Sequence, residues 1–217
     1  MPDSLRRLAP LTGIIYAACL VVAFVTPGSP NVHDSGAQVL AHYKAHHSAH
    51  QLGDGFGALG VLFFIFFITT LRSYFRDREG GNGLATAALV GGIFIAMGGA
   101  IFTSLDWAVA DARNSLTPAA AQAINVLSND FFWPFEIGLV AFSLTIGLAV
   151  IATGALPKWL GWVAVVIGIV GLTPVGFFGF FALMLWSVIV AILIFLRTAG
   201  KAGSPAAGQA GISGQAA

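Results

Sequence analysis

The histidines of this 217-residue chain gather in one short stretch. Four of the five lie in "AHYKAHHSAHQLGD", residues 41–54, as His42, His46, His47 and His50. On one continuous helix, the four-residue spacing that links His42, His46, His50 and Asp54 places them in a stripe along one face. The pair His46/His50 has the i, i+4 spacing that can place two imidazoles on one metal ion. The stretch is therefore a candidate metal site.

A metal site here needs ligands from elsewhere in the chain, and carboxylates are the available type. Zinc and copper both suit imidazole combined with carboxylate. The candidate metal ligands are His46, His50, Asp54, Asp106 and Glu136, with Asp130 as a further source of a carboxylate. Glu136 is also the candidate general base, because it is the acid that lies deepest in a predicted membrane span.

Two other interpretations of the histidine stretch stay open. Free imidazole titrates near pH 6.5, so clustered histidines that protonate together would repel and could sense pH. Alternatively, the stretch is a polar helix at the membrane surface, with histidines facing water or lipid headgroups. In that case Leu40 and Tyr43 would face the membrane.

Composition limits the class of protein. The chain is 57% hydrophobic and 9% charged, and its mean hydropathy is +0.87, whereas a soluble domain carries about a quarter charged residues. We therefore expect an all-α polytopic membrane protein. There is no basic stripe to neutralise phosphates, which argues against nucleic acid as a partner. The lone Cys19 excludes an internal disulfide.

Apolar runs predict the membrane spans. A helix needs roughly 20 apolar residues to cross the hydrocarbon core. The stretch Trp159–Leu196 is too long for one crossing, at about 57 Å, and "TPVG" at 173–176 predicts a turn inside it. The predicted spans are six, at about 8–26, 55–71, 84–105, 135–153, 159–173 and 177–196. They form one domain over residues 1–199, and residues 200–217 are predicted to be a disordered tail.

Loop charges predict the orientation of these spans. Eight of the ten basic residues fall on one side if the six spans alternate: Arg6, Arg7, Arg72, Arg76, Arg78, Lys158, Arg197 and Lys201. By the positive-inside rule, both termini are then cytoplasmic. All five histidines and most of the acids lie on the opposite, outer side.

The two long outer loops, 27–54 and 106–134, should each hold an amphipathic helix. Asp34 or Ser35 can cap the helix that starts "GAQVLAHY". Thr117 followed by Pro118 is a typical cap with proline at the first helical position. We therefore expect an outer cap built from two short helices.

The interior of the predicted spans lacks the residues of several known chemistries. No histidine or charged residue falls near the middle of a span, which argues against a membrane haem and against a midplane proton relay. Phosphate-binding loops, "HExxH" and "GxSxG" are missing. In the third span, Ala88, Gly92, Ala96 and Ala100 form a small-residue face. That face permits close helix packing, within the chain or with another copy or a partner membrane protein.

Two segments carry a resemblance. "DSGAQVLAHYKAHH" and the terminal "GALPKWLGWVAVVIGIVGLTPVGFFGF" resemble segments of small multi-pass membrane proteins of unknown function that are frequent in high-GC Gram-positive (actinobacterial-type) bacteria. The resemblance covers most of residues 8–197. It implies a bacterial plasma-membrane protein with about six spans, and it carries over no catalytic or ligand residues.

These observations favour a protein that binds or senses something at the outer membrane surface, or that supports another membrane complex. A metal-dependent membrane hydrolase acting on lipid-like substrates is the first alternative, with His46 and His50 holding the metal and Glu136 as the base. A small-solute transporter that uses the Gly-rich second and third spans is the second. The expected partner common to all three is the lipid bilayer.

Overall fold

The computed structural model describes residues 7–26 and 28–202, and over these ranges every regular element is a helix. In chain order they are η1 (Ala9–Leu11), α2 (Thr12–Val25), α3 (Gly36–Ala45), α4 (His47–Arg76), α5 (Gly81–Ala112), α6 (Pro118–Asp130), α7 (Trp133–Thr153), α8 (Lys158–Val170) and α9 (Gly176–Ala202). The predicted all-α class is confirmed. Helix α9 runs to Ala202, so residues 200–202 are helical rather than part of a disordered tail; residues 203–217 lie outside the described ranges.

The number of membrane spans differs from the prediction. Four helical stretches are long and apolar enough to cross a membrane: His47–Arg76, Gly81–Ala112, Pro118–Thr153 and Gly176–Thr198. The stretches Ala9–Val25 and Lys158–Val170 are apolar but shorter. With 13 residues, α8 is about 20 Å long, against a hydrocarbon core of about 30 Å. The six predicted spans are therefore not confirmed, although the helices are compatible with a membrane protein.

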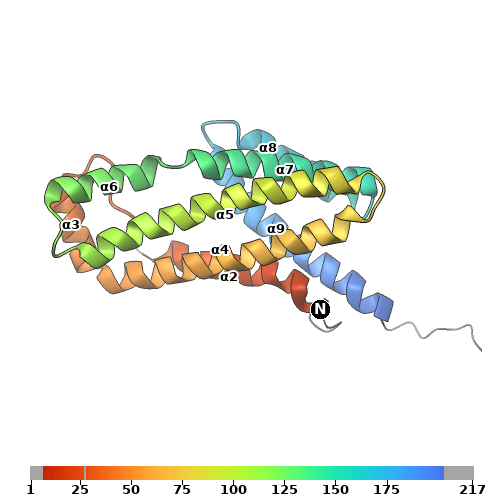
Figure 1. Cartoon of the computed structure of the whole chain (residues 1–217), viewed down its shortest axis with the longest axis horizontal. Helices are drawn as coiled ribbons and strands as arrows, with labels where there is room; N and C mark the ends of the chain where they lie inside the picture. The colour runs from red at the N-terminus through yellow and green to blue at the C-terminus, as the bar shows by residue number, and fades with distance from the viewer. Residues whose placement is uncertain (1–6, 27, 203–217) are drawn as a thin grey trace, which may run out of the picture.

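Helix α5 lies between α4 and α7, and its glycines bring the backbones close together (Figure 1). A Cβ added at Gly91 would lie 2.4 Å from the backbone nitrogen of Phe142 on α7. On the other side, a Cβ at Gly92 would lie 2.8 Å from the Ile68 side chain of α4. Of the predicted small-residue face, Ala88, Gly92 and Ala96 are buried inside the chain. The face therefore serves packing between helices of one chain, and a partner subunit stays a prediction.

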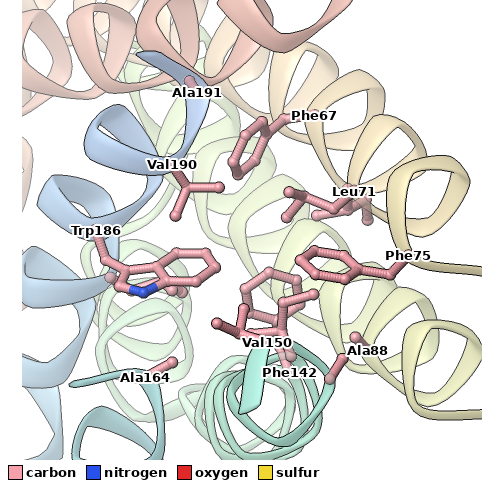
Figure 2. Close-up of a cluster of buried hydrophobic side chains, with 14 of the residues drawn as sticks. Phe67, Leu71, Phe75, Ala88, Phe142, Val150, Ala164, Trp186, Val190 and Ala191 are labelled. Carbon is pink, nitrogen blue, oxygen red and sulfur yellow. The ribbon is translucent and has the colours of Figure 1, made fainter. Parts of the chain in front are cut away.

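Aromatic side chains fill the centre of the bundle, as Figure 2 shows. Phe67, Phe75 and Phe142 are fully buried there, and Trp186 of α9 reaches between α7 and α8. The indole nitrogen of Trp186 donates to the Leu160 carbonyl at 2.9 Å, so its one polar atom is satisfied. This core holds the long helices in register.

The two ends of the bundle differ in the residues and elements that they carry. At one end, Tyr74 of α4 and Arg197 of α9 both donate to the carbonyl of Ala155. The basic residues near the end of α4, at the start of α8 and near the end of α9 therefore lie at one end of the bundle. At the other end α3 packs against α6 (Figure 1); we call this the cap end. The two predicted cap helices are thus confirmed, and they lie at the end of the bundle opposite Tyr74 and Arg197.

The start of each cap helix follows from its sequence. The Ser35 hydroxyl accepts from the Gln38 backbone, and the Gln38 side chain accepts from the Ser35 backbone at 2.8 Å, a complete capping box. The Thr117 hydroxyl accepts from the Ala120 backbone, with Pro118 at the first helical position. Both predicted caps are confirmed, with Ser35 rather than Asp34 as the N-cap residue of α3.

Candidate functional site

The carboxylate of Asp106 is the centre of a buried polar network at the cap end. Its Oδ1 accepts from the Tyr43 hydroxyl at 2.5 Å and from the Ser29 hydroxyl at 2.9 Å. Its Oδ2 lies 2.8 Å from Nδ1 of His50. Asp106 is 4% exposed, His50 3% and Tyr43 0%. Four separate segments, the 28–35 loop, α3, α4 and α5, therefore meet at this one carboxylate.

A break in the histidine stretch makes this meeting possible. Helix α3 ends at Ala45 and α4 starts at His47, while His46 between them has φ −117° and ψ 20°. The predicted continuous stripe is therefore wrong: His42 and His46 do not share a helix with His50. The separate direction of α3 lets its apolar face pack on α5 and α6.

The apolar face of α3 carries Tyr43 into the network. Val39, Leu40 and Tyr43 are buried against Val109 and Ala110 of α5 and Ala121 of α6. The expectation that Leu40 and Tyr43 face the membrane is wrong, because α6 covers them. Burial and the nearby charge of Asp106 raise the pKa of Tyr43 above its ordinary value, so this hydroxyl is a hydrogen-bond donor at any physiological pH.

Of the polar residues that line the neighbouring cavity, His50, Asp54 and Ser128 each have a buried side-chain atom without a partner in the described chain, and the first two belong to or adjoin the network. With Nδ1 turned to the Asp106 carboxylate, the other ring nitrogen of His50, Nε2, is buried and makes no hydrogen bond. The same holds for Oδ2 of Asp54, one turn further along α4, whose residue is 8% exposed. Buried polar atoms are nearly always hydrogen-bonded in proteins. These two therefore mark a place where a ligand or water belongs.

Both atoms belong to residues that line a cavity of about 610 Å³. Its polar lining consists chiefly of Ser29, His50, Asp54, Asp106, Ser128 and Asn129. The rest of the lining is mostly apolar and includes seven phenylalanines: Phe24, Phe102, Phe131, Phe132, Phe135, Phe177 and Phe180. From His50 to Val61, another lining residue, the cavity follows α4 for about 16 Å. The size is typical of small-molecule sites.

The carboxyl groups of Asp54 and Asp106 lie beside each other at the polar end of the cavity. Two negative charges held so close in a buried site repel, so the pair is stable only with a shared proton or a nearby cation. Asp106 already has three donors, whereas Asp54 Oδ2 has none. Asp54 is therefore the acid with capacity left for a ligand.

Three of the five predicted ligands come together, and two do not. His50, Asp54 and Asp106 meet in the network, as the sequence predicts. His46 is exposed at the helix break, and its Nδ1 lies 3.1 Å from the His42 carbonyl oxygen. Glu136 lines a different pocket, of about 590 Å³, beside Trp133 and Pro174. Its Oε1 would be 2.5 Å from a Cβ on Gly176, where α9 begins.

The metal prediction is not supported by any arrangement seen here. Over residues 7–26 and 28–202, no group of three or more His, Cys, Asp and Glu side chains is placed to hold a metal ion. Asp130, the further carboxylate considered, is exposed at the end of α6. Zinc or copper binding by His50 and its neighbours stays a prediction.

Sequence reasoning missed Tyr43, Ser29 and the α6 residues that complete the site. The hydroxyl donors are in the printed sequence, but no spacing rule links Tyr43 to Asp106 across 63 positions. The signal that was available is the apolar pattern of α3. Val39, Leu40 and Tyr43 share one face at helical spacing, and that face had to be covered by another element.

Comparison of the chain with protein-family models, with curated proteins and with solved structures gives no match. The resemblance to actinobacterial-type membrane proteins therefore stays a prediction.

Proposed function

We propose that this protein binds a small amphiphilic molecule at the outer face of a bacterial plasma membrane. The observation that carries the proposal is the cavity, whose lining combines unpartnered buried polar atoms of His50, Asp54 and Ser128 with seven phenylalanines. A ligand with one polar group and an apolar chain satisfies both parts. Binding or sensing, rather than catalysis, is the simplest role for such a site.

The place of the cavity supports this role over transport. Beyond Val61, the inward-facing residues of α4, including Phe64, Phe67 and Ile68, are buried in the apolar core. The described part of the cavity thus occupies only the cap half of the bundle. By the positive-inside rule, we expect the opposite end, with Arg76, Arg78 and Arg197, and both termini to be cytoplasmic. The cavity then lies on the outer side.

The experiment is a binding measurement with a matched pair of variants. Purified protein in nanodiscs is titrated with tritiated dodecylamine, and binding to empty nanodiscs is subtracted. Ala23 on α2 lines the cavity, whereas Val21, two residues away, is 51% exposed on the outside of the bundle. We expect saturable binding to wild type and to Val21→Trp, and none to Ala23→Trp. Equal binding to both variants would place the ligand elsewhere and contradict the proposal.

A second candidate is hydrolysis of a lipid-like substrate in the same cavity. The pairing of His50 with Asp106 favours it, because the carboxylate orients the imidazole and leaves Nε2 free to take up a proton. The test is hydrolysis of a dodecyl ester by wild type and His50→Gln, together with metal analysis of both proteins. Hydrolysis that is absent in wild type, or unchanged in His50→Gln, removes this candidate.

A further inference from the structure

The charges around the cavity are unbalanced. Two carboxyl groups, Asp54 and Asp106, lie at its polar end, and the described lining contains no lysine or arginine. The two basic residues near the cap end point elsewhere: Lys44 is exposed, and Arg113 donates to the carbonyl of Ala110. Within the described chain, His50 is the only base in ion-pair contact with either acid, and the His42 ring lies behind it, with 5.2 Å between the two ring centroids.

The unpartnered atoms of His50 and Asp54 are both hydrogen-bond acceptors, so each needs a donor from a ligand. Nδ1 of His50 donates to Asp106, so Nε2 of the neutral imidazole is an acceptor. Oδ2 of an ionised Asp54 is an acceptor as well. Two buried acceptors without donors therefore belong to the lining of one cavity, together with the unpartnered hydroxyl of Ser128, which can accept or donate. A ligand that brings several N–H groups and no acceptor satisfies them best.

Three common head groups of single-chain amphiphiles differ in how well they meet this need. A carboxylate would add further negative charge beside the Asp54–Asp106 pair. A hydroxyl brings one donor and leaves the charge imbalance in place. A primary ammonium brings three donors, no acceptor and the missing positive charge, and its hydrogen bond to a carboxylate is of the strong, charge-assisted kind.

We propose that the ligand is a long-chain primary amine, with its ammonium group held by Asp54 and His50 and its chain along the phenylalanine wall. The proposal rests on the proposed function, since it names the ligand class of the same cavity. Asp54 is the ion partner of the ammonium, His50 Nε2 accepts a second hydrogen bond, and Asp106 keeps the imidazole in the required orientation. The roughly 16 Å that the cavity follows along α4 accommodates the chain.

The test compares four dodecyl compounds on wild-type protein in nanodiscs at neutral pH: dodecylamine, dodecyltrimethylammonium, dodecanol and dodecanoate. They share one chain and differ in charge and in N–H donors. We expect dodecylamine to bind at least about tenfold more tightly than each of the others, because a charge-assisted hydrogen bond is lost in every other compound. Equal or tighter binding of dodecanol or dodecanoate would overturn the amine. Equal binding of dodecyltrimethylammonium would overturn the donor role of the N–H groups.

A pair of aspartate variants tests the assignment to Asp54. Asp54→Asn removes the charge but keeps the size, and Asp111→Asn does the same at an exposed position near the cap end of α5. We expect Asp54→Asn to lose about tenfold in dodecylamine affinity while dodecanol binding stays unchanged, and Asp111→Asn to match wild type. An unaltered preference for the amine in Asp54→Asn would overturn this assignment. If none of the four compounds binds wild type, the proposed function itself fails; if only the preference is wrong, the cavity still binds amphiphiles.

Discussion

Replacing Tyr43 by phenylalanine isolates one hydrogen bond of the buried network. The ring of Tyr43 is fully buried and packs on α5 and α6, and phenylalanine keeps that packing. The only group removed is the hydroxyl that donates to Asp106 Oδ1 at 2.5 Å. Hydrogen bonds to charged groups contribute about 1.5–3 kcal/mol. Asp106 keeps Ser29 and His50 as donors, so we expect a loss of about 2 kcal/mol in the free energy of unfolding.

The chain offers a matched control in Tyr16 of α2. Its side chain is also buried, at 3% exposure, but its hydroxyl makes no hydrogen bond within the described chain. Removing a buried polar group that lacks a partner is neutral or stabilising. Reversible unfolding by SDS in mixed micelles gives the free energy of unfolding for wild type, Tyr43→Phe and Tyr16→Phe.

The comparison of the two variants shows whether the hydrogen bond from Tyr43 to Asp106 stabilises the fold. If Tyr43→Phe is as stable as wild type, the bond to Asp106 contributes nothing and the network does not hold the cap end together. If both variants lose the same amount, the cost comes from the burial of a tyrosine ring and not from the Asp106 contact. Only a loss confined to Tyr43→Phe agrees with the geometry.

Two further predictions concern pH and helix packing. Burial, followed by the charges of two neighbouring imidazoles, lowers the pKa of His42 below its ordinary 6.5; protonation therefore favours the unfolded chain, and stability falls as the pH drops through about 6.5. His42→Gln should lose less thermal stability than wild type between neutral and mildly acidic pH, and an equal loss would refute this. Gly91→Ala should sharply reduce the yield of folded protein, because its Cβ meets the α7 backbone, whereas Gly83→Ala meets nothing within 4 Å and should fold as wild type does; size-exclusion chromatography of both checks this.

The class of fold was predictable because it depends on composition and on apolar run length. The cap helices were predictable because Ser35 and Thr117 are strong local signals. The number of membrane spans was less predictable. Whether Lys158–Val170 crosses a membrane depends on its length, which is set by where the chain turns. Apolar composition does not show this, because a helix of 13 residues can be as apolar as a longer one.

The candidate site was half predictable. Polarity alone brings His50, Asp54 and Asp106 to the same end of the bundle. Their pairing depends on the break at His46, where no proline or glycine marks the end of α3. Glu136 was misplaced for a related reason. The sequence gives its depth along α7, but which side of α7 faces the cavity depends on how the neighbouring helices pack.

The cap end and the opposite half of the bundle are held together by different kinds of interaction. At the cap end the links between segments include single hydrogen bonds, such as those to Asp106 and the bond from Asn125 to the carbonyl of Asn31 at 3.1 Å, together with one small apolar cluster. The opposite half rests on a continuous aromatic core. Backbone amides of α3 and α6 should therefore exchange with deuterium far sooner than those in the middle of α4 and α7. A molecule could then enter from the cap side through a local opening, while the rest of the bundle stays folded.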